Sequence, residues 1–150
     1  AKQGTCLLIG YHEDSSPLMP LEETAGGQTT ISEDDYLEGA PELIVEIAAS
    51  SAAINLYDKK RAYERNGVKE YLVWQVLDQK FDWFSLQNGK YSPLEKDNQG
   101  VIRSQVFPGL WLAVTALLAG DSQQVIQTLQ TGLNSPEYQA FATELNQSQK

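Results

Sequence analysis

The first candidate for chemistry is Glu46, an acidic residue inside an otherwise apolar segment. It stands in the run PELIVEIA, residues 41–48. Both alternating faces of this run carry apolar side chains, which is typical of a strand that is covered on both sides. A buried charge without a partner costs several kcal/mol. Glu46 therefore needs a cation from the protein, a metal ion or a proton. The alternative is a structural role, at a strand end or in a simple buried ion pair.

Glu42 is the nearest other carboxylate on the same face of this predicted strand. It precedes Glu46 by four residues, which is roughly 13 Å at about 3.3 Å per residue. One ion cannot reach both side chains, because its oxygen ligands lie at about 2.0 to 2.6 Å. We therefore expect Glu42, next to Pro41, to be a solvated residue at the strand entry. A second acidic ligand would have to come from another strand.

Cations follow on the next predicted element, a helix that runs to about Asn66. Ser50 and Ser51 can cap its start, and Gly67 suits the left-handed position that ends it. At 100° per residue, Lys59 and Lys60 flank the apolar stripe on opposite sides, so either lysine could bend inward. The stripe itself consists of Ala52, Leu56 and Tyr63.

Both lysines also have an ordinary alternative. A helix lysine usually extends into solvent, and Lys60 could pair with Glu64 one turn further on. This alternative fits Lys60 better than Lys59. The sequence therefore favours Lys59 as the inward cation.

The surrounding pattern predicts a mixed sheet. A second apolar strand, Glu70 to Val76, follows the helix, and two buried strands joined by a helix indicate a parallel crossover. The pairs Asp78-Gln79 and Asn88-Gly89 suit hairpin turns that would add antiparallel strands. Before this core, residues 10–40 predict loops with at most short strands. After it, three helices are expected: Leu110 to Leu118, Ser122 to Leu133, and one that begins at Ser135 with Pro136 at its first position.

Composition narrows the class of protein. The 150 residues suit a single α/β (α+β) domain, residues 1–150, with a mixed central sheet, flanking helices and C-terminal helices. The longest apolar runs fall short of the roughly 20 residues of a membrane helix, so no membrane association is expected. The single cysteine favours a reducing, cytoplasmic compartment. The net charge of −9 repels DNA, so phosphate binding needs a local basic patch or a bound cation.

Several segments together resemble one family. The run APELIVEIAASSAAINLYDKKRAYERNGVKEYLVW, residues 40–74, is similar to the core of the Uma-two family, nucleases of the PD-(D/E)XK restriction-endonuclease-like superfamily. Further matching segments are GGQT at 26–29, EGAPE at 38–42 and VFPGLWL at 106–112. The resemblance covers roughly residues 26 to 140, and its combination of motifs is more specific than any single one.

The resemblance implies a site and a reaction. It implies that Glu46 ligates a divalent ion, Mg²⁺ or Mn²⁺, and that the chain hydrolyses phosphodiester bonds in DNA. The superfamily lysine usually stands two residues after the acid, where this chain has Ala48. Lys59, four residues before Tyr63, matches a lysine that has moved onto the following helix. A carboxylate-bound cation and a nearby lysine would offset charge on the phosphate and activate a water.

The chain departs from the family pattern before the core. The family carries an aspartate on the preceding strand, usually after a proline, and no aspartate falls in register here. Asp14 is the nearest candidate for a second metal ligand. The N-terminal part is therefore atypical or incomplete: residues are absent from the sequence, or the protein has lost a ligand and is a catalytically inactive binding or interaction domain. An apolar sheet edge or the C-terminal helices offer surfaces for a homodimer.

Overall fold

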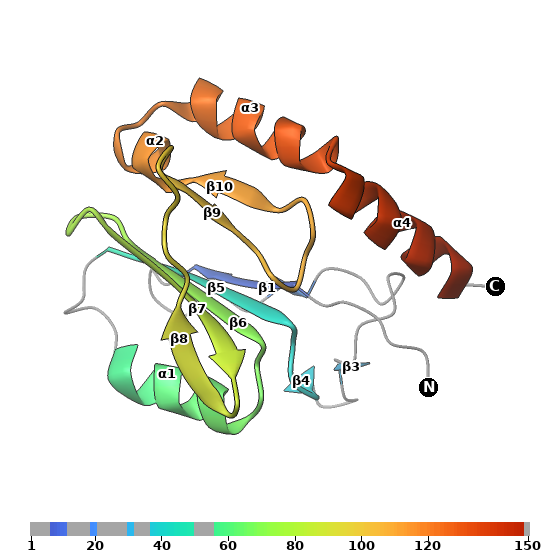
Figure 1. Ribbon diagram of the computed structural model, residues 1–150. Coiled ribbons are helices and arrows are strands. Elements are labelled where there is room, and N and C mark those ends of the chain that lie inside the picture. The colour runs from blue at the N-terminus through green and yellow to red at the C-terminus, as the bar shows by residue number, and fades with distance from the viewer. Residues whose placement is uncertain (1–6, 12–18, 21–29, 32–36, 50–55, 149–150) are drawn as a thin grey trace. The chain divides into compact units, whose positions relative to one another are not determined.

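The structure is a computed structural model that describes residues 7–11, 19–20, 30–31, 37–49 and 56–148 (Figure 1). Its elements in chain order are β1 (Leu7–Tyr11), β2 (Met19–Pro20), β3 (Thr30–Ile31), β4 (Leu37–Glu38), β5 (Leu43–Ala48), α1 (Leu56–Arg65), β6 (Glu70–Gln75), β7 (Lys80–Gln87), β8 (Lys90–Pro93), β9 (Val101–Arg103), β10 (Trp111–Ala113), α2 (Val114–Leu118), α3 (Ser122–Leu133) and α4 (Pro136–Ser148).

Among the described residues, six strands form one mixed sheet in the order β2-β1-β5-β6-β7-β8. β5 pairs in parallel with β1 on one side and with β6 on the other, whereas β6 pairs antiparallel with β7 (Figure 1). The predicted α+β fold with a mixed sheet and C-terminal helices is confirmed. β5 is an interior strand, which explains why its residues are apolar on both faces.

The helix α1 connects the two parallel strands β5 and β6, as the sequence predicted. The helix ends at Arg65, and Gly67, two residues further on, has a φ of 78°. The amide of Gly67 donates to the carbonyl of Glu64, and the amide of Val68 donates to the carbonyl of Tyr63. This is the Schellman arrangement, in which glycine takes the left-handed position without a steric penalty.

The α1 face of the sheet holds the core that surrounds the candidate site. Its buried members are Ile44, Val68, Tyr71 and Val73, and Leu56 and Tyr63 of α1 are among the residues that pack against them.

Both predicted hairpin turns are present in the structure. Gln79 has a φ of 49°, and Asn88 and Gly89 have φ values of 52° and 76°. At Asn88-Gly89, positive φ at both central residues is the signature of a type I′ hairpin.

The C-terminal helices correct one prediction. The segment from Leu110 to Leu118 was expected to be one helix, but its first part is β10, which pairs antiparallel with β9. Only Val114–Leu118 is helical. A short apolar run does not distinguish a strand from a helix, and in this chain the pairing with β9 makes the segment a strand.

The helices α3 and α4 agree with the prediction. Asp121 caps α3 by accepting a hydrogen bond from the amide of Gln124 at 3.0 Å.

The chain divides into two compact units, residues 1–92 and 93–150. The first unit contains the six-stranded sheet except the last residue of β8, together with α1. The second contains β9, β10 and the three later helices. The prediction of one restriction-endonuclease-like domain across residues 1–150 stays a prediction. No described helix is both long and apolar enough to cross a bilayer.

Candidate active site

Glu46 occupies the middle of the sheet and is 3% exposed. Its backbone lies opposite Gly10 of β1 and Val73 of β6. An isolated carboxylate at such a position would carry a large desolvation penalty. Its environment therefore has to supply donors or cations.

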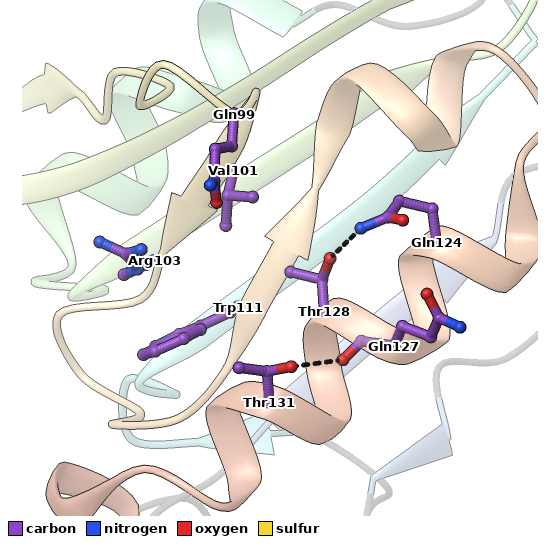
Figure 2. Close-up of a pocket in the computed structure, with 8 residues that line it drawn as sticks. All are labelled: Gln99, Val101, Arg103, Trp111, Gln124, Gln127, Thr128 and Thr131. Carbon is purple, nitrogen blue, oxygen red and sulfur yellow. Dashed lines mark hydrogen bonds between the residues drawn. The ribbon is translucent and has the colours of Figure 1, made fainter.

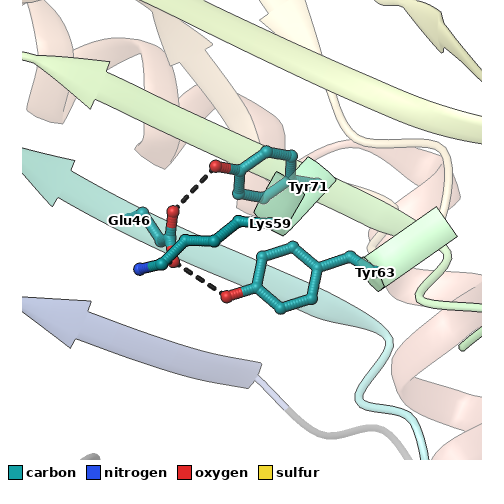
Figure 3. Close-up of polar contacts among 4 residues, drawn as sticks. All are labelled: Glu46, Lys59, Tyr63 and Tyr71. Atoms are coloured by element: carbon teal, nitrogen blue, oxygen red, sulfur yellow. Dashed lines mark hydrogen bonds and ion pairs between the residues drawn. The ribbon is translucent and has the colours of Figure 1, made fainter. Parts of the chain in front are cut away.

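Three donors converge on this carboxylate (Figure 3). The ammonium of Lys59 lies 2.8 Å from Oε1, and the hydroxyl of Tyr63 donates to the same oxygen at 2.8 Å. The hydroxyl of Tyr71 donates to Oε2 at 2.7 Å. One charged and two neutral donors thus compensate the buried charge on both of its oxygens.

The positions of these donors follow from local structure. Lys59 and Tyr63 are four residues apart on α1, so they share one face of the helix. Tyr71 lies on β6 opposite Ile44, which precedes Glu46 by two residues. Alternation along the strands therefore places Tyr71 and Glu46 on the same face of the sheet. The parallel crossover β5–α1–β6 brings all four side chains together.

Burial keeps both tyrosines protonated. Removal from solvent raises the pKa of Tyr63 well above its ordinary value, and the negative charge of Glu46 raises it further. The pKa of Tyr71 is raised by the same two causes in the same order. Both hydroxyls are therefore neutral donors over the whole physiological pH range.

Lys60, the other inward candidate, has a different partner. Its ammonium lies 3.6 Å from the centroid of the Phe84 ring, a cation–π contact. The suggested partner of Lys60, Glu64, instead forms an ion pair with Lys90 at 2.9 Å. The amide of Tyr91 also donates to Glu64 at 2.8 Å. The hydrogen bond from this amide lowers the pKa of the Glu64 carboxyl most, and the hydrogen bond from Lys90 lowers it further.

The structure brings together two of the three residues that the sequence singled out. The charged atoms of Glu46 and Lys59 are in direct contact, while their roles as metal ligand and catalytic lysine stay predictions. Asp14, the third, lies outside the described residues. Glu42 was expected to be solvated, and that expectation is wrong because the residue is 4% exposed. Its backbone carbonyl accepts a hydrogen bond from the amide of Glu70 at 2.8 Å.

The sequence analysis missed the two tyrosine hydroxyls. Tyr63 was assigned to the apolar stripe of the helix, and Tyr71 was not singled out. The sequence held a signal for Tyr63, which follows Lys59 by one helical turn. It held none for Tyr71, because the side chain of Tyr71 is placed on the same face as Glu46 by the parallel register of β5 and β6.

The residues at Glu46 fit a divalent cation through a single protein carboxylate. In the described part of the chain, no three His, Cys, Asp or Glu side chains gather where they could hold a metal ion. A carboxylate has about four acceptor positions, and the three contacts described above use three of them. Mg²⁺ usually keeps several waters and takes one or two carboxylates plus phosphate oxygens of the substrate. Among the described residues one acceptor position on Oε2 is therefore left, which is compatible with such an ion.

A hollow lies in the unit of residues 93–150, away from Glu46 in the sequence (Figure 2). Its volume is about 430 Å³. The guanidinium of Arg103 lies 4.5 Å from the centroid of the Trp111 ring and forms an ion pair with Asp97 at 3.2 Å. The lining residues are Gln99, Val101, Arg103, Trp111, Gln124, Gln127, Thr128 and Thr131. None of these side chains is a carboxylate, so this hollow lacks the acid that metal-assisted hydrolysis needs.

The fold and the site define a class of protein: an α+β domain in which a buried carboxylate on an interior strand faces a lysine from the next helix. A family model named Uma2 and described as "Putative restriction endonuclease" matches residues 19–115. This match covers more than half of the chain, and the chain belongs to the Uma2 family. The predicted resemblance is thus confirmed. No curated protein matches the chain.

Proposed function

We propose that this chain is a metal-dependent nuclease domain that hydrolyses phosphodiester bonds in DNA and works in the cytoplasm. The observation that carries the proposal is the pairing of Glu46 with Lys59 at 2.8 Å within the β5–α1 unit. Membership of the Uma2 family supports it, because the match includes both residues. In this proposal Glu46 is the metal ligand and Lys59 is the catalytic cation.

The chemistry follows from what the phosphate requires. A Mg²⁺ or Mn²⁺ ion bound to Glu46 would offset the charge that builds on the phosphate and would activate a water. Lys59 is placed to neutralise a phosphate oxygen, because 28% of its side chain is exposed while that of Glu46 is almost fully buried. We propose Asp14 as a second acidic ligand. It follows β1, the strand that pairs with β5 on one side of Glu46.

One observation favours a second candidate function. In the described residues the partners of Glu46 are a lysine and two tyrosines, with no second acid among them. A carboxylate compensated in this way can be purely structural. The alternative proposal is therefore a catalytically inactive domain that keeps the nuclease fold and acts in binding or interaction.

The experiment that tests the proposal is a cleavage assay on labelled duplex DNA. The net charge of −9 weakens DNA binding, so the assay is carried out at low ionic strength. The proposal predicts slow cleavage with Mg²⁺ or Mn²⁺ and none in excess chelator. An absence of cleavage with every divalent ion, at protein concentrations that bind DNA, supports the inactive binding domain instead.

A further inference from the structure

The carboxylate of Glu46 is held by hydroxyls from two different elements. Tyr63 on α1 donates to Oε1, and Tyr71 on β6 donates to Oε2. A single donor would let the planar carboxylate rotate about its bond to the side chain. Two donors on opposite oxygens, each carried by a packed element, fix the plane of the group (Figure 3).

The two tyrosines and Lys59 contribute differently. Lys59 supplies the positive charge that compensates Glu46, but it is a flexible side chain that is 28% exposed. Tyr71 is 1% exposed. The ring of Tyr63 packs edge-on against it, with centroids 5.1 Å apart. The orientation of the carboxylate therefore depends on the tyrosines more than on the lysine.

A role in packing alone does not account for the hydroxyls. The ring of Tyr71 also stacks with Phe84 at a centroid distance of 6.1 Å, and a phenylalanine ring would fill the same space. What phenylalanine would lack is the donor to Glu46. Tyr91 offers a comparison within the same aromatic group, because its hydroxyl donates to the carbonyl of Val68 at 2.8 Å and not to Glu46.

We infer that Tyr63 and Tyr71 are positioning residues, which hold the Glu46 carboxylate in the orientation that binds a divalent cation. The inference rests on the proposed function. Groups that hydrogen-bond a metal-ligating carboxylate orient it, and their loss typically weakens metal affinity by about 10- to 100-fold. Neither tyrosine needs to touch the substrate or the ion for this effect.

The test compares Tyr63→Phe, Tyr71→Phe and the matched control Tyr91→Phe with the native chain. Each variant keeps its ring and loses one buried hydroxyl. Mn²⁺ affinity is measured by titration calorimetry without DNA, and folding is checked by near-ultraviolet circular dichroism. We expect Tyr63→Phe and Tyr71→Phe to weaken Mn²⁺ binding about tenfold, and Tyr91→Phe to stay within about twofold of the native chain. In the cleavage assay, raising the Mn²⁺ concentration should restore the rates of the first two variants.

Each outcome decides the inference. Native-like Mn²⁺ affinity in Tyr63→Phe and Tyr71→Phe overturns it, and so does an equal loss in Tyr91→Phe, which would indicate a general effect of packing. If Tyr71→Phe does not fold, Tyr63→Phe decides alone, because Tyr63 is only partly buried. If the native chain binds no Mn²⁺, the proposed function fails first and the inference fails with it. That result differs from a native chain that binds Mn²⁺ alongside variants that bind it equally well.

Discussion

The ammonium of Lys59 lies 2.8 Å from Oε1 of Glu46, with 28% of the lysine side chain and 5% of the glutamate side chain exposed. The pair is therefore asymmetric. Lys59 can be solvated without Glu46, whereas the glutamate depends on its partners to compensate a buried charge. The same geometry serves a structural ion pair and a catalytic site, so experiments have to separate the two roles.

Removing the cation should destabilise the fold. We expect Lys59→Met to lower the free energy of unfolding by about 2 to 3 kcal/mol, which is below the range of about 3 to 5 kcal/mol for a fully buried pair because Lys59 is partly exposed. In the double variant Glu46→Gln/Lys59→Met the two effects should be less than additive. Denaturant unfolding measures the stability of the single and the double variants. The control is Lys90→Met, which breaks an exposed pair with Glu64 and should change stability little. Native stability in Lys59→Met would mean that the ion pair contributes nothing to the fold.

A divalent ion should stabilise the native chain through Glu46. Binding to the folded state alone adds about 2.7 kcal/mol when the ion is present at 100 times its dissociation constant. We therefore expect Mg²⁺ or Mn²⁺ to raise the melting temperature of the native chain by several degrees and to leave that of Glu46→Gln unchanged. Glu64→Gln is the control for loss of a carboxylate elsewhere. Equal shifts in the native chain and in Glu46→Gln would exclude Glu46 as a ligand.

The buried tyrosines should make stability sensitive to alkali. The pKa values of Tyr63 and Tyr71 are raised in the folded state, first by burial and then by the charge of Glu46. The unfolded chain loses these protons near pH 10, so their contribution to stability is complete below pH 10 and is lost as the pH rises further. In Glu46→Gln, the charge is gone and both pKa values should fall towards the ordinary value. Titration of tyrosinate absorbance in the two proteins measures this difference, and superimposable curves would contradict it.

The end of α1 should require its glycine. Gly67 has a φ of 78° with no atom within 4 Å of the place a Cβ would occupy. An added methyl group therefore meets backbone strain and no clash, and we expect Gly67→Ala to lose about 1 kcal/mol of stability. Gly67→Asn should lose less, because asparagine tolerates this conformation better. Denaturant unfolding of both variants is the check, and an alanine variant as stable as the native chain would argue against the Schellman ending.

The requirement for a partner at Glu46 could be predicted from the sequence, and the sequence favoured Lys59 as the lysine that supplies it. A charge within LIVEIA must be compensated, and that argument needs only the local pattern. Lys59 and Lys60 flank the helix stripe on opposite sides, so the helical wheel alone allows either of them to bend inward. In the structure the ammonium of Lys60 lies over the ring of Phe84 and is therefore not directed at Glu46. Phe84 lies on β7, and its place beside the helix follows from strand pairing that local periodicity does not encode.

Pairing between distant segments also explains where the structure differs from the other predictions made from the sequence. β10 was predicted as helix because a short apolar run has no distinctive period, and its strand conformation comes from β9. The hydroxyl of Tyr71 reaches Glu46 across 25 residues of sequence, through a parallel register that no turn encodes locally. Elements with local signals, such as α1 with Gly67 and the Asn88-Gly89 hairpin, were predicted correctly.

Whether Glu46 and Lys59 form a metal-dependent nuclease site can be measured by DNA cleavage with matched variants. The measurement is the single-turnover rate of DNA cleavage in Mn²⁺ at low ionic strength, for Glu46→Gln and Lys59→Met beside Glu64→Gln and Lys90→Met. The second pair of variants removes an ion pair whose charged atoms lie 2.9 Å apart, between Glu64 of the same helix and Lys90 of β8. We expect the first two variants to lose cleavage while remaining folded, and the other two to cut at the native rate. Cleavage that persists in Glu46→Gln would exclude Glu46 from the nuclease site.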